Sequence, residues 1–301
     1  MLSHEGTPPR YLVAGASGLI GSALVRRLRE TDGHVRTLTR GQAGGSAYSW
    51  DPARGTIDPA ALEWADSVIS LNGASLSRLP WTASYRRQIL RSRVDSAATI
   101  ARAIAVADSP PRVWVSASAV GIYGSRPGET LTEESARGTG FLADVVQAWE
   151  AATGPAARVA RVVLARTGIV LAPDGALRPL VLAARLGLGG DVGGGQQHWP
   201  WIALADEVSA LAHLAGDSAL AGPVNLVAPQ PATAGDITRE VARQLHRPHW
   251  APMPAPVLRA AMGAAANELL LADQLVRPVR LEADGFRFAQ PELAGAVAAA
   301  L

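Results

Sequence analysis

Three glycines near the start of the chain are spaced as in a phosphate-binding turn. The segment reads Gly15-Ala16-Ser17-Gly18-Leu19-Ile20-Gly21 and follows the apolar run 11–14. A strand before the turn and a helix beginning inside it are the context in which such a motif binds a dinucleotide diphosphate. Gly15 would permit the tight turn, Gly18 would let the backbone approach the diphosphate, and Gly21 would let helix and strand pack closely. The alternative is a purely structural turn.

The end of the second predicted strand indicates which dinucleotide would bind. An Asp or Glu about 20 residues beyond the loop would hydrogen-bond the ribose 2′-OH of NAD and repel a 2′-phosphate. The chain reads Leu38-Thr39-Arg40 there, without an acid. Arg40 can pair bidentately with a phosphate, and the Thr39 and Ser17 hydroxyls can add hydrogen bonds. The sequence therefore favours NADP, with NAD as the other candidate and a solvated surface arginine as the alternative for Arg40.

Ser118 and Tyr123 are the side chains that could handle a proton. Both follow a predicted strand that ends near residue 116, and ligands dock at the carboxyl ends of parallel strands. Tyr123 could act as an acid beside a nicotinamide while Ser118 positions a carbonyl oxygen. Nothing visible in the sequence would lower the pKa of this tyrosine from about 10. Tyr123 as a packed wall of the pocket is therefore the alternative.

Composition excludes several other chemistries. The 301-residue chain has no cysteine and no lysine, so its 28 basic residues are all arginine. Thiolate and lysine chemistry are excluded, and a reducing cytoplasm is the expected location. Of its six histidines, only His246 and His249 lie close in sequence, in a predicted loop, so we expect no metal site. A net charge of +2 argues against a nucleic-acid partner, and no apolar run approaches the roughly 18 residues of a membrane span.

Strands alternate with helices from residue 11 to residue 165. Apolar runs predict buried strands, and helically spaced apolar residues predict the helices between them. The predicted strands are 11–14, 34–39, 68–71, 112–116 and 159–165, and the predicted helices are 19–30, 83–107 and 140–152. Residues 41–55, rich in Gly, Ser and Pro, are predicted to be irregular. The alternation indicates an α/β fold, a Rossmann-type doubly wound parallel sheet.

Beyond residue 168 the pattern changes, and from residue 232 onward it predicts a smaller, mostly helical C-terminal lobe. A helix is expected over 176–186 and another from Asp206 to about residue 215, and Trp201 is expected in the core. Residues 187–195 contain six glycines and predict either a mobile lid or a hairpin with positive φ angles. We place the NAD(P)-binding domain at 10–228 and the C-terminal lobe at 229–301.

The chain resembles the extended, atypical branch of the short-chain dehydrogenase/reductase superfamily, in particular an NAD(P)-dependent epimerase-like family of uncharacterised function with its own C-terminal domain. The stretches that carry the resemblance are 14–21, 71–74, 81–82, 92–93, 116–124, 166–171, 185–190, 200–202 and 268–286. The resemblance implies cofactor contacts at Thr39, Arg40, Leu71, Asn72, Gln88, Arg93 and Val170. For Arg93, a phosphate contact and a helix-surface position are equally compatible with the sequence.

One departure from the superfamily pattern bears on activity. Its enzymes usually use a Tyr-x-x-x-Lys pair for proton transfer. Phe141 occupies the tyrosine position and Val145 the lysine position, and neither can move a proton. We therefore expect an NADP-binding epimerase- or oxidoreductase-like protein with atypical proton handling, acting on an unidentified small molecule. The alternative is a non-catalytic NADP(H)-binding sensor or scaffold, and either could form a homodimer.

Overall fold

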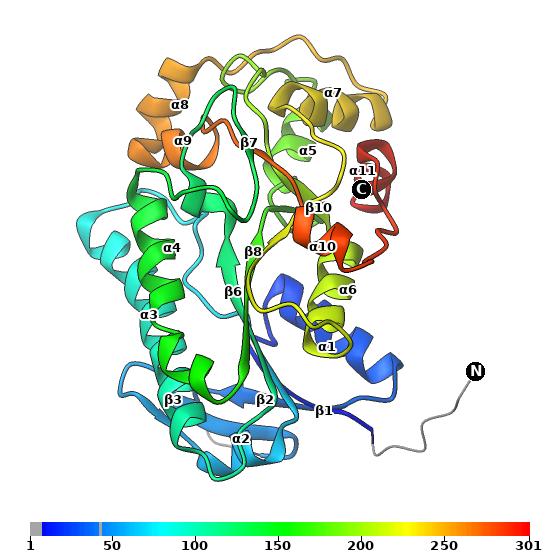
Figure 1. The fold of residues 1–301 in the computed structure, drawn as a ribbon. Coiled ribbons are helices and arrows are strands. Elements are labelled where there is room, and N and C mark those ends of the chain that lie inside the picture. Colours follow the sequence, from blue (N-terminus) through cyan, green and yellow to red (C-terminus); the bar gives the residue numbers. More distant parts are fainter. Residues whose placement is uncertain (1–7, 42–43) are drawn as a thin grey trace.

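An eight-stranded sheet organises the N-terminal part of the chain in the computed structural model, which describes residues 8–41 and 44–301 (Figure 1). In spatial order the strands are β11 (Gly222–Leu226), β8 (Arg161–Thr167), β6 (Val113–Ala119), β5 (Ser67–Ser70), β1 (Arg10–Ala14), β2 (His34–Thr39), β3 (Ala47–Asp51) and β4 (Thr56–Ile57). Only the β3–β4 pair is antiparallel within this sheet. The chain winds outward from β1 in both directions, which confirms the predicted doubly wound sheet.

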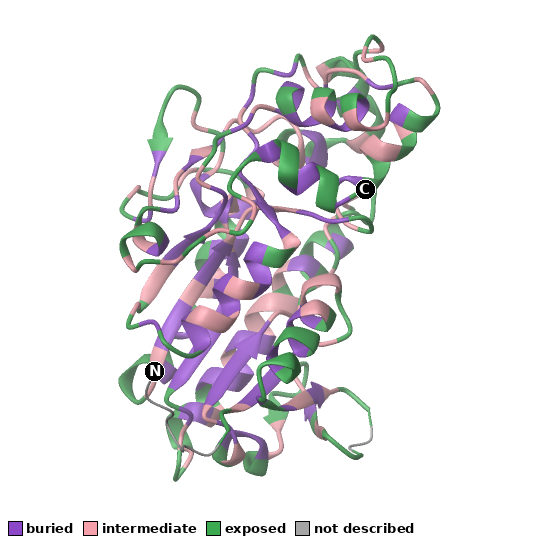
Figure 2. Ribbon diagram, turned by 90° about the vertical axis from the view of Figure 1, so that its right-hand side faces the viewer, coloured by how far each residue is buried: buried purple, intermediate pink, exposed green. Residues whose placement is uncertain are grey.

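Helices cover both faces of this sheet. Alternate residues of β1 point to opposite faces: Val13 joins the apolar core beneath α1 (Leu19–Glu30) and α6 (Leu204–Ala215). Leu12 joins the core beneath α2 (Pro59–Trp64), α3 (Ala83–Val106) and α4 (Phe141–Ala151). Figure 2 shows the resulting buried centre along the strands and exposed outer helix faces. Burial on both faces explains why these strands are nearly continuous apolar runs in the sequence.

The remaining helices gather in a second group beyond the sheet, at the top and right of Figure 1. They are α5 (Arg178–Arg185), α7 (Ala234–Gln244), α8 (Ala255–Met262), α9 (Ala264–Leu269), α10 (Val279–Ala283) and α11 (Leu293–Ala299). Two small parallel pairs, β9 (Ile169–Leu171) with β10 (Trp201–Ala203) and β7 (Thr130–Leu131) with β12 (Leu275–Val276), tie this group to the rest. Two 3-10 turns, η1 (Val120–Tyr123) and η2 (Gly154–Arg158), complete the elements.

The structure corrects two local expectations and confirms a third. Residues 41–55 are not irregular throughout, because β3 pairs with β2 and buries Trp50, and the short helix α2 was not predicted. The carboxylate of Asp206 does not cap α6, which begins at Leu204; it accepts the backbone N–H groups of Ala289 (2.6 Å) and Gln290 (2.9 Å) instead. Trp201 is 1% exposed, which confirms its place in the core.

Backbone hydrogen bonds join the glycine-rich stretch 187–195 to the segment 249–253. Gly187 and Gly193 to Gly195 all have φ between 64° and 99°, which a residue with a Cβ adopts only with strain. The carbonyl of Gly189 accepts the N–H of Trp250 (2.9 Å), and Gly193 N–H donates to the carbonyl of Met253 (2.9 Å). The positive φ angles of the hairpin alternative are confirmed, but the stretch forms parallel bridges with His249 and Met253 rather than a hairpin. Within the described part of the chain, no helix is both long and apolar enough to cross a membrane.

Candidate cofactor site

A cavity of about 1340 Å³ opens at the carboxyl ends of β1, β2, β3 and β5, beside α3. The chain order reverses between β1 and β5, and ligands of open α/β sheets bind at such a switch point. The loop after β1 lines the cavity together with the ends of β2 and β3, the segment after β5, and one face of α3. The lining includes eight of the residues predicted to bind the cofactor: Gly15, Ser17, Gly18, Thr39, Arg40, Leu71, Asn72 and Gln88.

The three glycines of the turn differ in why a side chain is absent at their positions. Gly15 has φ 84°, and a Cβ there would lie 2.9 Å from backbone atoms of Leu71 and Asn72. A Cβ on Gly21 would lie 2.1 Å from the carbonyl oxygen of Gly15, so the helix could not approach the turn. Gly18 is different, because its nearest neighbour would be 3.4 Å away and its φ is −77°. The protein itself has room for a side chain at Gly18, so the space there suits a bound group.

The N-terminus of α1 is open toward this space. Gly18 is the N-cap residue, no side chain caps the helix, and no acidic residue lies in its first turn. The free N–H groups and the helix dipole can therefore hold an anion such as a diphosphate. Asn72, on the neighbouring segment, has a buried side-chain oxygen with no hydrogen-bond partner among the described residues. A ligand hydroxyl or amide could satisfy that oxygen, so the residues present fit a dinucleotide.

Five predicted contacts do not line the cavity: Leu19, Ile20, Gly21, Arg93 and Val170. Ile20 and Val170 pack with Ala16 and Leu71 against the core beneath α1. Gly21 acts through backbone packing, as described above. These residues shape the floor of the site in this structure, and direct contact by any of them stays a prediction.

Arg93 is not the helix-surface side chain that one of its two alternatives described, and the phosphate contact of the other alternative stays a prediction. Its Nη1 donates to the carbonyls of Ala74 (3.2 Å) and Ile89 (3.1 Å) rather than pointing to solvent or into the cavity. Burial lowers the pKa of its guanidinium to about 10. A Cβ on Gly73 would lie 3.1 Å from this guanidinium. Arg93 therefore supports the loop after β5 from behind.

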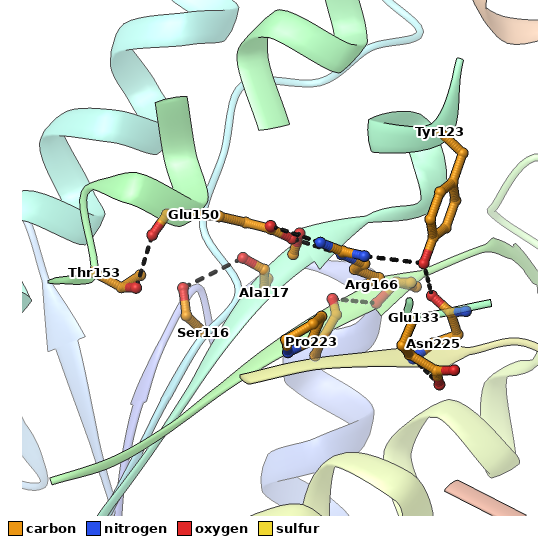
Figure 3. A network of polar contacts seen from close by, with 12 residues as sticks. Ser116, Ala117, Tyr123, Glu133, Glu150, Thr153, Arg166, Pro223 and Asn225 are labelled. Atoms are coloured by element: carbon orange, nitrogen blue, oxygen red, sulfur yellow. Dashed lines mark hydrogen bonds and ion pairs between the residues drawn. The ribbon is translucent and has the colours of Figure 1, made fainter. Parts of the chain in front are cut away.

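Ser118 and Tyr123 belong to a buried polar network (Figure 3). Ser118 Oγ donates to Glu150 Oε1 (2.6 Å), and Arg166 donates to both oxygens of that carboxylate (2.8 and 2.9 Å). Arg166 also donates to the hydroxyl of Tyr123 (3.0 Å), which in turn donates to Asn225 Oδ1 (2.7 Å). Burial would lower the pKa of Arg166, but its bonds to Glu150 and Tyr123 outweigh burial and raise it.

This network does not place Tyr123 as expected. The side chain is 0% exposed, Ser118 is 5% exposed, and neither lines the cavity. Burial raises the pKa of the tyrosine hydroxyl, although Arg166 and Asn225 oppose the rise. Tyr123 packs with Val120 and Ile122 in a small core cluster rather than forming a pocket wall. The structure therefore joins Ser118 and Tyr123 to each other, through Glu150 and Arg166, but not to the cofactor turn.

The helix that would carry the proton-transfer pair has an apolar inner face. Phe141 packs edge-on against Trp81, with ring centroids 5.6 Å apart, and the guanidinium of Arg86 lies 4.2 Å from the Phe141 ring centroid. Val145 packs with Tyr85 and Ile89. The buried residues of α4 are Leu142, Ala143, Val145, Val146 and Trp149. Phe141 and Val145 thus offer no proton-transferring group. The α4 residue that reaches the sheet with an ionisable group is Glu150, whose carboxylate is engaged by Ser118 of β6 and Arg166 of β8.

Two features of the site escaped the sequence reasoning. Arg87 and Arg91 of α3 line the cavity, and their spacing on the same helix face as Gln88 could have indicated it. Glu268 of α9 accepts the N–H groups of Phe141 (2.9 Å) and Leu142 (3.1 Å) and so caps α4. No local signal marks that distant pairing. Across residues 8–41 and 44–301, no group of three or more His, Asp or Glu is arranged to hold a metal.

Comparison with known families agrees with this geometry. The model described as the NAD dependent epimerase/dehydratase family matches residues 11–225. The chain belongs to this family. A second model, described as a domain of unknown function (DUF1731), matches residues 253–300. The resemblance drawn from the sequence, including its separate C-terminal domain, is confirmed.

Similar proteins cover nearly the whole chain. An epimerase family protein of Mycobacterium bovis is 40% identical over 282 residues, 92% of each chain. The crystal structure of human epimerase family protein SDR39U1 with NADPH has a TM-score of 0.87 at 31% identity and covers 96% of this chain and 97% of the human one. A nucleoside-diphosphate sugar epimerase of Corynebacterium glutamicum has a TM-score of 0.81 at 32% identity, covering 98% of this chain and 58% of that one.

Proposed function

We propose that this protein binds NADP(H) in the cavity and acts as an epimerase- or oxidoreductase-like enzyme on an unidentified small molecule. The observation that carries the proposal is the uncapped N-terminus of α1 opening into a cavity of about 1340 Å³. That volume exceeds the roughly 300–1,000 Å³ of pockets for drug-sized ligands and suits a dinucleotide. Bound NADP(H) would supply hydride transfer, and the cysteine-free chain suits a reducing compartment such as the cytoplasm.

The preference for NADP over NAD rests on charge. Arg40 lies at the end of β2, where an acid would select NAD, and it lines the cavity. Thr39 and Ser17 line the cavity as well, and their hydroxyl groups can donate hydrogen bonds to a phosphate. The NADPH bound to the human relative supports the same choice.

Substrate protonation needs a route other than α4. Ser118 or Tyr123 could reach a substrate only if the bonds to Glu150 and Asn225 were exchanged for substrate contacts. We propose that Ser118 exchanges its hydrogen bond to Glu150 for one to the substrate. Tyr123 would not touch the substrate and would act on Ser118 through Arg166 and Glu150. Ser118→Ala and Tyr123→Phe should then abolish hydride transfer while NADPH binding is retained.

A second candidate function is a non-catalytic NADP(H) sensor or scaffold, alone or as a homodimer. The apolar inner face of α4 and the buried hydroxyls of Ser118 and Tyr123 favour it. Incubation with stereospecifically deuterated NADPH and a panel of carbonyl compounds separates the two functions. Loss of label supports the enzyme, whereas saturable binding without label loss across the panel supports the sensor. If neither NADPH nor NADH bound, both proposals would fail.

A further inference from the structure

The α3 wall of the cavity carries positive charge that the diphosphate site does not explain. Arg87 and Arg91 lie one turn apart, and both line the cavity. Residues at this spacing are neighbours on a helix surface. Two arginines on one wall, facing Arg40 on the sheet edge, indicate a site for more negative charge than a diphosphate at α1 would bring.

Arg40, Arg87 and Arg91 do not use their guanidinium groups to bind other described residues of the chain. None of Arg40, Arg87 and Arg91 is hydrogen-bonded or ion-paired there. The neighbouring arginines of α3 do have such roles: Arg86 covers the ring of Phe141, and Arg93 donates to the carbonyl of Ala74. The three cavity arginines are thus available to a ligand.

The cavity also contains two carboxylates, which limit where an anion can lie. Asp51 is engaged, because its Oδ1 accepts the N–H groups of Ala53 (3.0 Å) and Arg54 (3.3 Å). Asp95 lies one turn beyond Arg91 on α3. The three arginines exceed the two acids by one, so the ionisable side chains that line the cavity carry a net positive charge.

The position of Arg91 identifies the part of the dinucleotide that it would meet. A second hollow of about 450 Å³ adjoins the cavity, and the two share Pro52, Ala53, Arg91 and Asp95. Pro52 and Ala53 follow β3, which pairs with β2, the strand that ends beside Arg40. Arg91 therefore borders the β2–β3 end of the cavity, which is the adenosine end of a dinucleotide whose diphosphate lies at α1.

We propose that Arg91 is the second half of the 2′-phosphate site, so that this phosphate is held between Arg40 from β2 and Arg91 from α3. This inference rests on the proposed binding of NADP(H) and adds a specificity-determining residue to it. Guanidinium groups approaching from two walls can each donate a pair of N–H groups to one phosphate. Selectivity against NADH then depends on two elements of the fold rather than on the end of β2 alone.

The test compares ligands that differ only in the 2′-phosphate. Dissociation constants for NADPH, NADH, 2′,5′-ADP and 5′-AMP are measured by calorimetry at one fixed low ionic strength, since screening weakens exposed charge pairs. The variants are Arg40→Gln, Arg91→Gln and Arg102→Gln. Arg102 is the matched control, because it lies on the same helix but lines only the second hollow of about 450 Å³ and not the cavity. Circular dichroism checks that each variant is folded.

We expect Arg91→Gln to weaken NADPH and 2′,5′-ADP about tenfold or more, as for the loss of a hydrogen bond to a charged group. The affinities for NADH and 5′-AMP should change less than about twofold, and Arg102→Gln should leave the affinities for all four ligands close to wild type. Equal weakening of NADPH and NADH by Arg91→Gln would overturn the assignment, as would no weakening of either. If the wild-type protein bound neither dinucleotide, the proposed function itself would fall.

Discussion

Replacing Glu207 by Gln should make the protein more stable relative to wild type as the pH rises. Glu207 lies in the first turn of α6 and is fully buried. One carboxyl oxygen accepts the hydroxyl of Thr167 (2.8 Å), and the other has no partner among the described residues. Burial raises the pKa of this carboxyl to about 8. Gln keeps the shape of the side chain and removes its titration.

The size of the effect follows from linkage between protonation and folding. The carboxyl has a pKa of about 4.5 when unfolded and about 8 when folded. Between these values the folded state holds a proton that the unfolded state has released, so stability falls as pH rises. Each pH unit contributes about 1.4 kcal/mol, which gives about 3 kcal/mol between pH 5.5 and pH 7.5. Below pH 4.5 the folded and unfolded states are both protonated, and this loss is absent.

Urea unfolding of wild type and Glu207→Gln at pH 5.5, 6.5 and 7.5 measures this difference directly. The advantage of the variant should grow by about 3 kcal/mol over that range, because only the wild type loses the contribution. Glu63→Gln is the control, since Glu63 is exposed on α2, and it should follow the wild type. A difference between Glu207→Gln and wild type that stays constant with pH would refute the reasoning.

Four further substitutions test the packing of the site. Arg166→Met leaves the Glu150 carboxylate buried without its partner and should lower the free energy of unfolding by about 3–5 kcal/mol in urea; no loss would contradict a structural role for the pair. Gly21→Ala should fail to fold or melt far below wild type, whereas Gly18→Ala should stay folded and lose NADPH affinity; similar melting temperatures for both would contradict this. Glu268→Ala removes the cap of α4 and should cost about 1 kcal/mol, read as a lower melting temperature; an unchanged one would contradict it.

The sheet could be predicted because its signals are local. Strands buried on both faces leave continuous apolar runs, as in residues 11–14 of β1. The alternating pattern of β2 likewise indicated where that strand begins and ends. Strand β3 left no such run: Trp50 is its only buried residue, and glycines and serines precede it. Its formation depends on pairing with β2 at Thr37 to Thr39. That is a tertiary contact which residue types around 41–55 do not encode.

The cofactor turn depends on local contacts and could be predicted, whereas the polar network depends on contacts between residues far apart in the sequence. Gly15 is required by its positive φ and Gly21 by the carbonyl oxygen of Gly15, both within one strand–turn–helix unit, so their spacing alone indicates their role. Ser118 and Glu150 are 32 positions apart, and Tyr123 and Asn225 are 102 positions apart. Hydrogen bonds over such separations depend on how α4 and β11 pack on the sheet. The sequence therefore pointed to the right hydroxyls but not to the partners that bury them.

A crystal structure of the protein with NADPH tests the central claim most directly. The account predicts the diphosphate against the backbone N–H groups of Leu19 and Ile20, because the N–H of Gly18 already donates to the carbonyl of Gly15 (3.1 Å). It predicts the 2′-phosphate within hydrogen-bond distance of Arg40. A dinucleotide bound elsewhere on the protein, or its diphosphate away from the N-terminus of α1, would contradict the account.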